Sequence, residues 1–508
     1  MSPIKGFQLV LLTISVSFGI FMNVLDTSIA NVAIPTIAGN MAVSADQGTW
    51  VITSFMVSMA IILPLTGWLS RRFGEVRLFT LSTLFFTLAS LLCGLSQNLP
   101  TLVFFRVIQG IFAGPMIPLS QSLLLANYPP DKKGLATALW ATVAVAAPVL
   151  GPILGGYITD NFSWPWIFYI NLPVGLFSSY FTWKTLKDRE TKILKVPMDL
   201  VGLILLIISV GCLQILLDQG KDLDWFNSTI ISTLAILVGI SLSFFIIWEL
   251  TEKAPIVDLR LFTIRNFAVG TIAISLGYMA FFGSVVVLPL WLQTRMNYTP
   301  TWAGLATAPL GVLPVLFSPL IGHLMNKIDL RIIISFGFIM FSACSFWLSH
   351  FTTDIGAGNV AWIRFIQGIG APCFFIGCTS VLLAGLPNER LASAAGLSNF
   401  LRILAGSFGT SISITLWDHR EAVHQSTLVE NLNLHSQNLD NVFMQANALG
   451  FSNEETNAEL MTTVINQAYM LATDDIFYLS GYVFLALMVL VWFAKPPFFT
   501  KTKTQMAE

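Results

Sequence analysis

Long apolar runs recur along the whole chain, and short polar stretches separate them. A helix needs about 20 apolar residues to cross the ~30 Å hydrocarbon core of a membrane. The runs are about 18–27 residues long, and we count fourteen, centred near residues 21, 60, 87, 113, 146, 175, 208, 239, 280, 313, 340, 372, 405 and 486. Since only helices of this length satisfy their backbone within lipid, the pattern predicts an all-α polytopic membrane protein with fourteen transmembrane helices.

Lysine and arginine concentrate in alternate loops, and this bias predicts the orientation in the membrane. With the N-terminus inside, the cytoplasmic segments contain 20 of the 26 Lys and Arg residues, and the outer loops contain three. The remaining three are Arg106, Arg364 and Arg402, which lie within predicted helices. Both termini are therefore predicted to be cytoplasmic. No small-residue cleavage site follows the first run, so we expect it to stay as the first helix.

The chain also repeats itself. Segment 106–110 (Arg-Val-Ile-Gln-Gly) recurs as segment 364–368 (Arg-Phe-Ile-Gln-Gly), and segment 67–77 has a weaker echo at 322–331. Two similar halves are typical of transporters that move two bundles around a midplane site. We predict an N-terminal six-helix bundle over 1–195, two inserted helices over 196–252, a C-terminal six-helix bundle over 253–417 and 475–508, and a periplasmic segment over 418–474.

The periplasmic segment is long and rich in Asn, Gln, Glu and Ser. Ser452 and Glu455 have the spacing of a capping box, in which the side chain of each residue bonds the backbone of the other. We therefore predict a short helix outside the membrane.

Composition supports the membrane class and gives no support to an enzyme. Hydrophobic residues make up 55% of the chain and charged residues 10%, well below the charged share of soluble domains. The five cysteines and five histidines show no metal-ligand spacing, and no nucleotide loop or hydrolase triad appears. We predict no metal, no cofactor and no nucleic-acid partner.

Asp26 is the carboxylate that the sequence places well inside an apolar run, where an unpaired charge is costly. The helical rise puts Asp26 and Arg106 at similar depths, about 10 Å and 9 Å from the outer ends of their helices, so they can pair. The pair is either purely structural or a proton site. A nearby arginine favours the charged carboxylate and desolvation favours the protonated form, so a rearrangement can load or release a proton. The repeat places Ser284 opposite Asp26, so the architecture does not require an acid there.

Two further arginines lie in the second half. Arg364 lies near the outer end of its helix, where a snorkelling head group is sufficient explanation. Arg402 is deeper, and it either binds an anionic ligand or bonds helix-end carbonyls. As candidate lining of a substrate cavity we name, with Arg402, the residues Phe21, Asn31, Gln109 and Tyr278.

The sequence resembles the major facilitator superfamily, and within it the fourteen-helix drug:proton antiporter family, most closely the EmrB-type multidrug exporters. The resemblance covers nearly the whole chain. The residues that carry it are Leu25 to Pro35, Gly67 to Arg77, Arg106 to Gly114, Gly151 to Gly156, Trp166 to Asn171 and Trp492 to Phe498.

The resemblance implies roles for several residues. It makes Arg106 a proton-coupling residue, and segment 67–77 a cytoplasmic gate that includes Gly67, Arg71, Arg72, Gly74 and Glu75. It also implies an antiporter motif formed by Gly151, Pro152, Gly155 and Gly156. This chain departs from the family at Ala147, where the motif begins with glycine, and at Arg71 and Glu75, whose charges look exchanged. If the exchanged charges still form a gate, each should meet an opposite charge.

The resemblance further implies export of hydrophobic drugs and uncouplers across the bacterial inner membrane, driven by the proton gradient. Similar proteins work with a periplasmic adaptor protein and, through it, an outer-membrane channel. The resulting hypothesis is proton-coupled efflux of amphipathic small molecules by alternating access. The alternatives are a proton-coupled symporter for an anionic nutrient and a membrane receptor or assembly scaffold.

Overall fold

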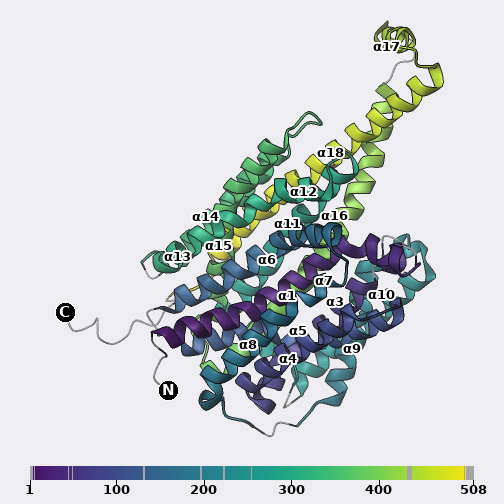
Figure 1. Ribbon diagram of the computed structural model, residues 1–508. Helices are drawn as coiled ribbons and strands as arrows, with labels where there is room; N and C mark the ends of the chain where they lie inside the picture. Colours follow the sequence, from purple (N-terminus) through teal and green to yellow (C-terminus); the bar gives the residue numbers. More distant parts are fainter. Residues whose placement is uncertain are drawn as a thin grey trace.

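The computed structural model describes residues 4, 6–43, 45–48, 50–129, 132–194, 197–220, 223–252, 255–325, 327–431, 437–496 and 498. Within these residues the protein is helical and contains no strand (Figure 1). The first half contains α1 (Phe7–Asn40), α2 (Ala45–Gly48), α3 (Trp50–Phe73), α4 (Glu75–Gly94), α5 (Leu99–Asn127), α6 (Lys133–Asn161), α7 (Trp166–Tyr169), α8 (Asn171–Leu186) and the 3-10 helix η2 (Lys187–Arg189).

The remaining elements comprise a central pair and the second half. The pair is α9 (Leu200–Gln219) and α10 (Thr229–Thr251), with the 3-10 turns η3 (Trp225–Asn227) and η4 (Leu259–Thr263). The second half contains α11 (Arg265–Thr294), α12 (Pro300–Thr307), η5 (Ala308–Gly311), α13 (Val312–Leu324), α14 (Leu330–Leu348), α15 (Ala357–Leu383), α16 (Asn388–Asn431), α17 (Gln437–Ala448) and α18 (Asn453–Val491).

All fourteen predicted centres fall in helical elements. Twelve helices of the described residues are long and apolar enough to cross a membrane. The other two predicted spans coincide with α6 and α8, so the structure is consistent with fourteen spans. The predicted run around residue 313 is formed by α12, η5 and α13 together, because prolines such as Pro309 cannot donate a backbone hydrogen bond.

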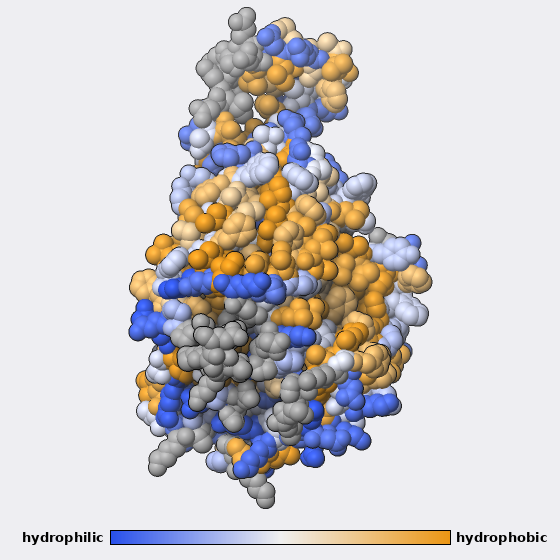
Figure 2. Space-filling view, turned by 90° about the vertical axis from the view of Figure 1, so that its left-hand side faces the viewer, coloured by the Kyte–Doolittle hydropathy of each residue, from blue (hydrophilic) through white to orange (hydrophobic). Residues whose placement is uncertain are grey.

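The outer surface of this helical body is hydrophobic. Figure 2 shows a broad orange region on the face drawn, and α10 carries further exposed apolar side chains. Ile236, Phe244 and Ile247 are each more than 60% exposed. A surface of this kind is suited to lipid contact rather than to water.

The central pair α9 and α10 packs beside the line where the two halves meet. Polar side chains join it to α16, because the Gln214 amide donates to the Ser407 hydroxyl at 3.1 Å and the Trp225 indole donates to the Thr415 hydroxyl at 3.1 Å. The pair therefore contacts the second half through α16, and α9 also packs on α3 of the first half.

The two halves meet closely at the helix ends that are joined by the loops rich in Lys and Arg, on the predicted cytoplasmic side. A Cβ atom built on Gly67 of α3 would lie 2.9 Å from the backbone Cα of Ser393 in α16. A Cβ built on Gly134 of α6 would lie 2.7 Å from the carbonyl oxygen of Gly322 in α13. Only glycine allows such close approach, so the predicted cytoplasmic side is closed in this structure.

The outer segment differs from the prediction. The capping box is confirmed, since the Ser452 hydroxyl accepts from the Glu455 amide at 3.2 Å and the Ser452 amide donates to the Glu455 carboxylate at 2.8 Å. However, this box opens α18, which continues without interruption to Val491, and no short separate helix begins there. The separate short helix is α17. The 44 residues of α16 span about 66 Å, roughly twice the hydrocarbon thickness, so α16 and α18 project together beyond the body (Figure 1).

Candidate functional site

Asp26 and Arg106 form a buried ion pair in the first half. Both side chains are 0% exposed, and an Arg106 Nη1–H donates to Asp26 Oδ2. The same nitrogen donates to Gln109 Oε1 at 2.8 Å. The matching depths that the sequence predicted for the two residues are thus confirmed as a direct contact.

Two amides complete the environment of the carboxylate. The Gln109 amide and the Asn171 amide each donate to Asp26 Oδ1 at 3.1 Å. Asn171 also donates to the Ser90 hydroxyl at 3.0 Å. Helices α1, α5 and α8 therefore meet at one carboxylate, α4 supports Asn171 through Ser90, and three donors surround the carboxylate with little access to water.

The arginine is held from its other side by aromatic rings and by the backbone. Its Nε–H donates to the Val51 carbonyl at 2.8 Å, and its guanidinium carbon lies 4.3 Å from the centre of the Phe55 ring and 5.5 Å from that of Phe168. Its Nη2 is buried without a hydrogen-bond partner among the described residues. The guanidinium is therefore fixed in place, yet its Nη2 still has N–H groups from which the carboxylate can accept a hydrogen bond after a rearrangement.

The second half repeats the arginine but replaces the acid. Arg364 donates to Gln367 Oε1 at 2.7 Å, as Arg106 does to Gln109. Its other terminal nitrogen donates at 3.0 Å to the backbone carbonyl of Ser284. Arg364 is 1% exposed, so the interpretation as a snorkelling residue is wrong. The same scaffold therefore supports its arginine with a neutral carbonyl, and the carboxylate at Asp26 is a feature of the first half alone.

The predicted antiporter motif lies against α1 one turn from Asp26. A Cβ on Gly151 would lie 2.5 Å from the Ser28 Cβ, and a Cβ on Gly155 would lie 2.9 Å from the Ile29 carbonyl oxygen. Gly156 faces the second half, where a Cβ built on it would lie 3.9 Å from the Thr301 hydroxyl oxygen. The Pro152 side chain lies outside the described residues. These glycines let α6 follow the backbone of α1 closely.

The predicted charge pairing in the gate loop is not found. The Glu75 carboxylate accepts from the Ser122 hydroxyl at 2.8 Å, and Arg71 Nε donates to the Gly67 carbonyl at 3.2 Å. Among the described residues neither side chain meets an opposite charge, because both are satisfied by neutral groups within the first half. Arg72 is exposed.

A different acid organises this loop. The Glu190 carboxylate accepts from the backbone amides of Val76 and Arg77 at 3.0 and 2.9 Å, at the start of α4. Gly74 begins that helix at φ +88°, where a side chain is strained, and a Cβ there would lie 2.4 Å from the Glu190 carboxyl carbon. The glycine thus allows both the turn and the cap.

Replacing Gly67 with valine is expected to prevent closure at Ser393. Overpacking of this kind costs about 1–3 kcal/mol, which shifts the equilibrium between closed and open inner ends about 5- to 150-fold. Distances between spin labels at the exposed positions 72 and 390 should increase. Gly239→Val is the matched control, because nothing lies within 4 Å of a Cβ built on Gly239. Unchanged label distances in Gly67→Val would contradict the role assigned to Gly67.

The residues proposed for a substrate cavity separate into different places. Tyr278 and Arg402 lie together, with the guanidinium carbon 5.1 Å from the tyrosine ring centre. Gln109 belongs instead to the Asp26 network, because its amide and carbonyl bond the two charged groups. Phe21 is partly buried on α1, without a ring contact to Tyr278 or Arg402. The Asn31 side chain lies outside the described residues.

Sequence reasoning did not identify three buried polar groups. Asn171 and Ser90 belong to the Asp26 network, and only the position of Asn171 after the aromatic run 166–170 marks it. Glu249 in α10 is also 0% exposed, so Asp26 is not the sole buried carboxylate. One Glu249 oxygen accepts from the Val257 amide at 3.1 Å near the end of its helix. No group of three potential metal ligands occurs among the described residues.

Comparison with known proteins places the chain in a family. The model of the Major Facilitator Superfamily matches residues 16–410. The chain is 51% identical to the multidrug export protein EmrB of Escherichia coli K12 over 497 residues, covering 98% of this chain and 97% of that protein. It is 49% identical to the fatty acid resistance protein FarB of Neisseria gonorrhoeae over 496 residues, with 98% of each chain covered.

Solved structures agree on the fold. The human organic anion transporter MFSD10 (TETRAN) superposes with a TM-score of 0.59 at 12% identity, covering 96% of this chain and 100% of that one. The proton:xylose symporter XylE gives a TM-score of 0.59 at 13% identity, with 95% of each chain covered. The predicted family is therefore confirmed: this chain is an EmrB-type member of the Major Facilitator Superfamily and a multi-pass protein of the bacterial inner membrane.

Proposed function

We propose that the protein exports hydrophobic and amphipathic small molecules, including drugs and uncouplers, across the inner membrane in exchange for protons. The names of its relatives support the export of drugs and, for FarB, protection against fatty acids. In this proposal the protein catalyses no covalent reaction and needs no cofactor, because the proton gradient supplies the energy.

The observation that carries the proposal is the carboxylate of Asp26. It is fully buried, bonded to Arg106, and replaced in the second half by a backbone carbonyl. A buried pair that has only a structural role is often no better than an apolar one, so its retention in one half alone favours a function. Asp26 is the proton carrier in this account.

Contacts between helices connect the protonation site at Asp26 to the closed inner ends of the two halves. Protonation of Asp26 removes its charge attraction to Arg106 and weakens the bonds from Gln109 and Asn171. The resulting shift of α1 acts on α6, because Gly151 and Gly155 hold the two helices in contact beside Ser28 and Ile29. Helix α6 also carries Gly134, which touches Gly322 across the inner seam. One continuous helix, α6, thus links the carboxylate to the closure between the halves.

The direction of coupling tests this proposal. Cells that express the protein should tolerate higher drug concentrations, and inside-out membrane vesicles should accumulate the drug when their interior is acidic. Arg402 favours a second candidate, symport of an anionic solute. That function would instead move the solute in the same direction as protons, and a receptor or scaffold would move neither.

We also propose that the α16–α18 hairpin binds a periplasmic adaptor protein, which leads to an outer-membrane channel. The hairpin has an ordered base, where Asp475 accepts from Arg420 at 2.6 Å and lies 2.7 Å from His424. Its tip bears exposed apolar side chains, at Val442, Met444, Leu449 and Phe451.

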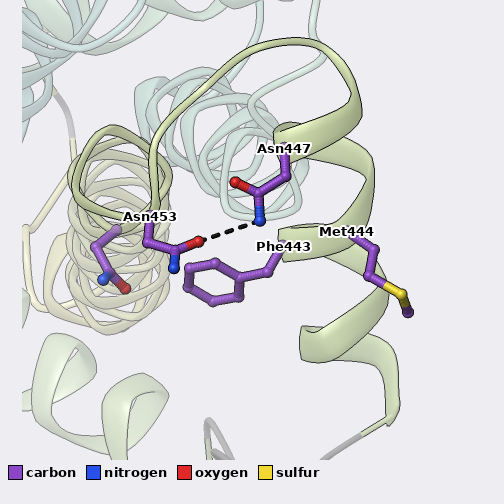
Figure 3. Close-up of a pocket in the computed structure, with 5 residues that line it drawn as sticks. Phe443, Met444, Asn447 and Asn453 are labelled. Carbon is purple, nitrogen blue, oxygen red and sulfur yellow. Dashed lines mark hydrogen bonds between the residues drawn. The ribbon is translucent and has the colours of Figure 1, made fainter.

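Helix α17 is fixed at this tip by a small contact. Figure 3 shows Phe443 pointing toward α18, with Met444 directed away from it. The Asn447 amide donates to the Asn453 carbonyl at 3.2 Å. The surface presented by the hairpin is therefore preformed, which supports recognition of a protein partner.

Replacing residues 429–464 with a short Gly/Ser connector should remove the tip and leave the base. Gradient-driven transport in vesicles of the purified protein should stay near the wild-type rate, while resistance of whole cells should fall. The Arg420, His424 and Asp475 contacts remain in this variant, and a Val442→Ser, Met444→Ser double variant serves as a milder probe. Loss of vesicle transport with adaptor binding intact would place the hairpin in the transport path instead.

A further inference from the structure

Arg402 is a buried cation for which the described residues supply no hydrogen bond. Its side chain is 6% exposed, and its Nε has no partner. The alternative that it bonds helix-end carbonyls therefore finds no support. A charge removed from water without a partner is strongly unfavourable, so the position calls for an explanation.

The other two deep arginines have partners. Arg106 meets the Asp26 carboxylate, and Arg364 meets Gln367 and the Ser284 carbonyl. For Arg402 the described residues supply two aromatic contacts instead, with its guanidinium carbon 5.1 Å from the Tyr278 ring centre and 5.8 Å from that of Trp140. Cation–π contacts of this kind offset only part of the desolvation of a guanidinium.

Arg402 and its two aromatic neighbours come from both halves. Arg402 and Tyr278 belong to α16 and α11 of the second half, and Trp140 belongs to α6 of the first. The Trp140 ring is anchored, because its indole donates to the Ser120 hydroxyl at 2.9 Å. The unpaired cation therefore faces the seam between the bundles, where alternating access exposes a substrate.

An apolar wall stands beside the cation. The Tyr278 ring centre lies 4.4 Å from Phe282, 5.8 Å from Phe375 and 6.3 Å from Phe281. The Tyr278 hydroxyl has no hydrogen bond among the described residues, so it is a second free donor near the guanidinium. A cation and a hydroxyl at the edge of an aromatic surface fit a molecule with one negative charge on an apolar body.

We infer that Arg402 and Tyr278 bind the anionic group of amphipathic substrates, and that the neighbouring phenylalanines receive the apolar part. The inference rests on the proposed export function and names its substrate class: organic anions with an apolar body, such as medium-chain carboxylates. The anion supplies the counter-charge that Arg402 lacks.

Binding of matched probes to the purified protein in nanodiscs tests the inference. Dodecanoate, dodecanol and dodecylamine share one apolar chain and differ in charge, and titration calorimetry with empty nanodiscs subtracted gives their affinities. The wild type should prefer dodecanoate, then dodecanol, then dodecylamine. Because charge-assisted hydrogen bonds contribute about 1.5–3 kcal/mol, Arg402→Gln should weaken dodecanoate binding about ten- to hundredfold and leave dodecanol binding unchanged.

Two further variants refine the test. Arg402→Lys should recover part of the dodecanoate affinity, since it keeps the charge without the planar fork. Tyr278→Phe should cause a smaller, several-fold loss, as expected for one neutral hydrogen bond. If Arg402→Gln does not fold, the order of the wild-type affinities for the three probes still tests the inference. A wild-type preference for dodecanol or dodecylamine, or an equal loss of dodecanoate and dodecanol in Arg402→Gln, would overturn the inference.

These binding measurements need no proton gradient. If the protein shows the predicted order of affinities but no drug–proton exchange, the anion site is supported and the proposed function is contradicted. If the protein exchanges drug for protons but shows no preference for dodecanoate, the proposed function is supported and the anion site is contradicted.

Discussion

Replacing Asp26 with asparagine is expected to abolish efflux driven by a pH gradient while leaving the protein folded in the membrane. Asparagine is close in size and can still accept from Arg106 and Gln109 through its carbonyl oxygen, but it cannot take up a proton. Inside-out vesicles should therefore show no uphill accumulation of drug. Downhill exchange of labelled for unlabelled drug should continue, because that exchange needs no proton transfer.

The internal repeat provides a matched control for this variant. Ser284→Ala changes the equivalent place in the second half, where the side chain donates to the Phe281 carbonyl at 2.8 Å. It should transport at the wild-type rate. Full uphill transport by Asp26→Asn would remove Asp26 from the coupling mechanism.

Replacing Arg106 with alanine is expected to cause the largest combined loss of stability and transport. Removing one partner of a buried ion pair costs about 3–5 kcal/mol, because the other charge stays in a site without water. Exchange should stop as well, because the guanidinium that holds the Asp26 carboxylate in place is gone. Arg106→Lys keeps the charge but loses the planar fork that bonds Asp26, Gln109 and Val51 together, so we expect intermediate transport.

Arg364→Ala is the control for Arg106→Ala. It also removes a buried arginine, but the groups left behind are neutral, so it should lower the thermal midpoint while drug transport remains coupled to protons. Thermal unfolding in detergent and vesicle transport measure the two effects separately. Normal transport by both Arg106→Ala and Arg106→Lys would show that the ion pair has no part in coupling.

The helices and the Asp26–Arg106 pair could be predicted from the sequence because their signals are local. Apolar length defines a membrane helix, and the rise per residue gives the depth of Asp26 and Arg106. The repeat then predicted Ser284 opposite Asp26, and the structure agrees, because Arg364 bonds the Ser284 carbonyl. These predictions needed only spacing along one helix or an offset between two halves.

The remaining features depend on contacts between distant segments. Asn171 reaches Asp26 from a helix 145 residues later in the chain, and nothing near Asn171 reveals that contact. The gate loop is organised by Glu190, which the charge pattern of segment 67–77 does not contain. The capping box at Ser452 correctly marked a helix start, but the length of α18 follows from its packing against α16 as well as from its cap.

Glu249 shows the limit of arguments from apolar runs. It lies near the end of α10, where a charge ordinarily reaches the interface, yet it is fully buried and bonds the Val257 amide of the following segment. The fold of residues 255–258 against the helix end decides its burial. A hydropathy pattern describes the helix and not the segment that returns over it.

The central claim, that Asp26 carries the proton exchanged for substrate, is tested most directly by proton flux in proteoliposomes. Vesicles loaded with a pH-sensitive dye receive a gradient of a drug to which the protein confers resistance and which has no titratable group between about pH 5 and pH 9. Drug movement through the wild type should drive protons in the opposite direction, and Asp26→Asn should move the drug downhill with no proton flux. Protons that move with the drug, or an undiminished opposite flux in Asp26→Asn, would contradict the account.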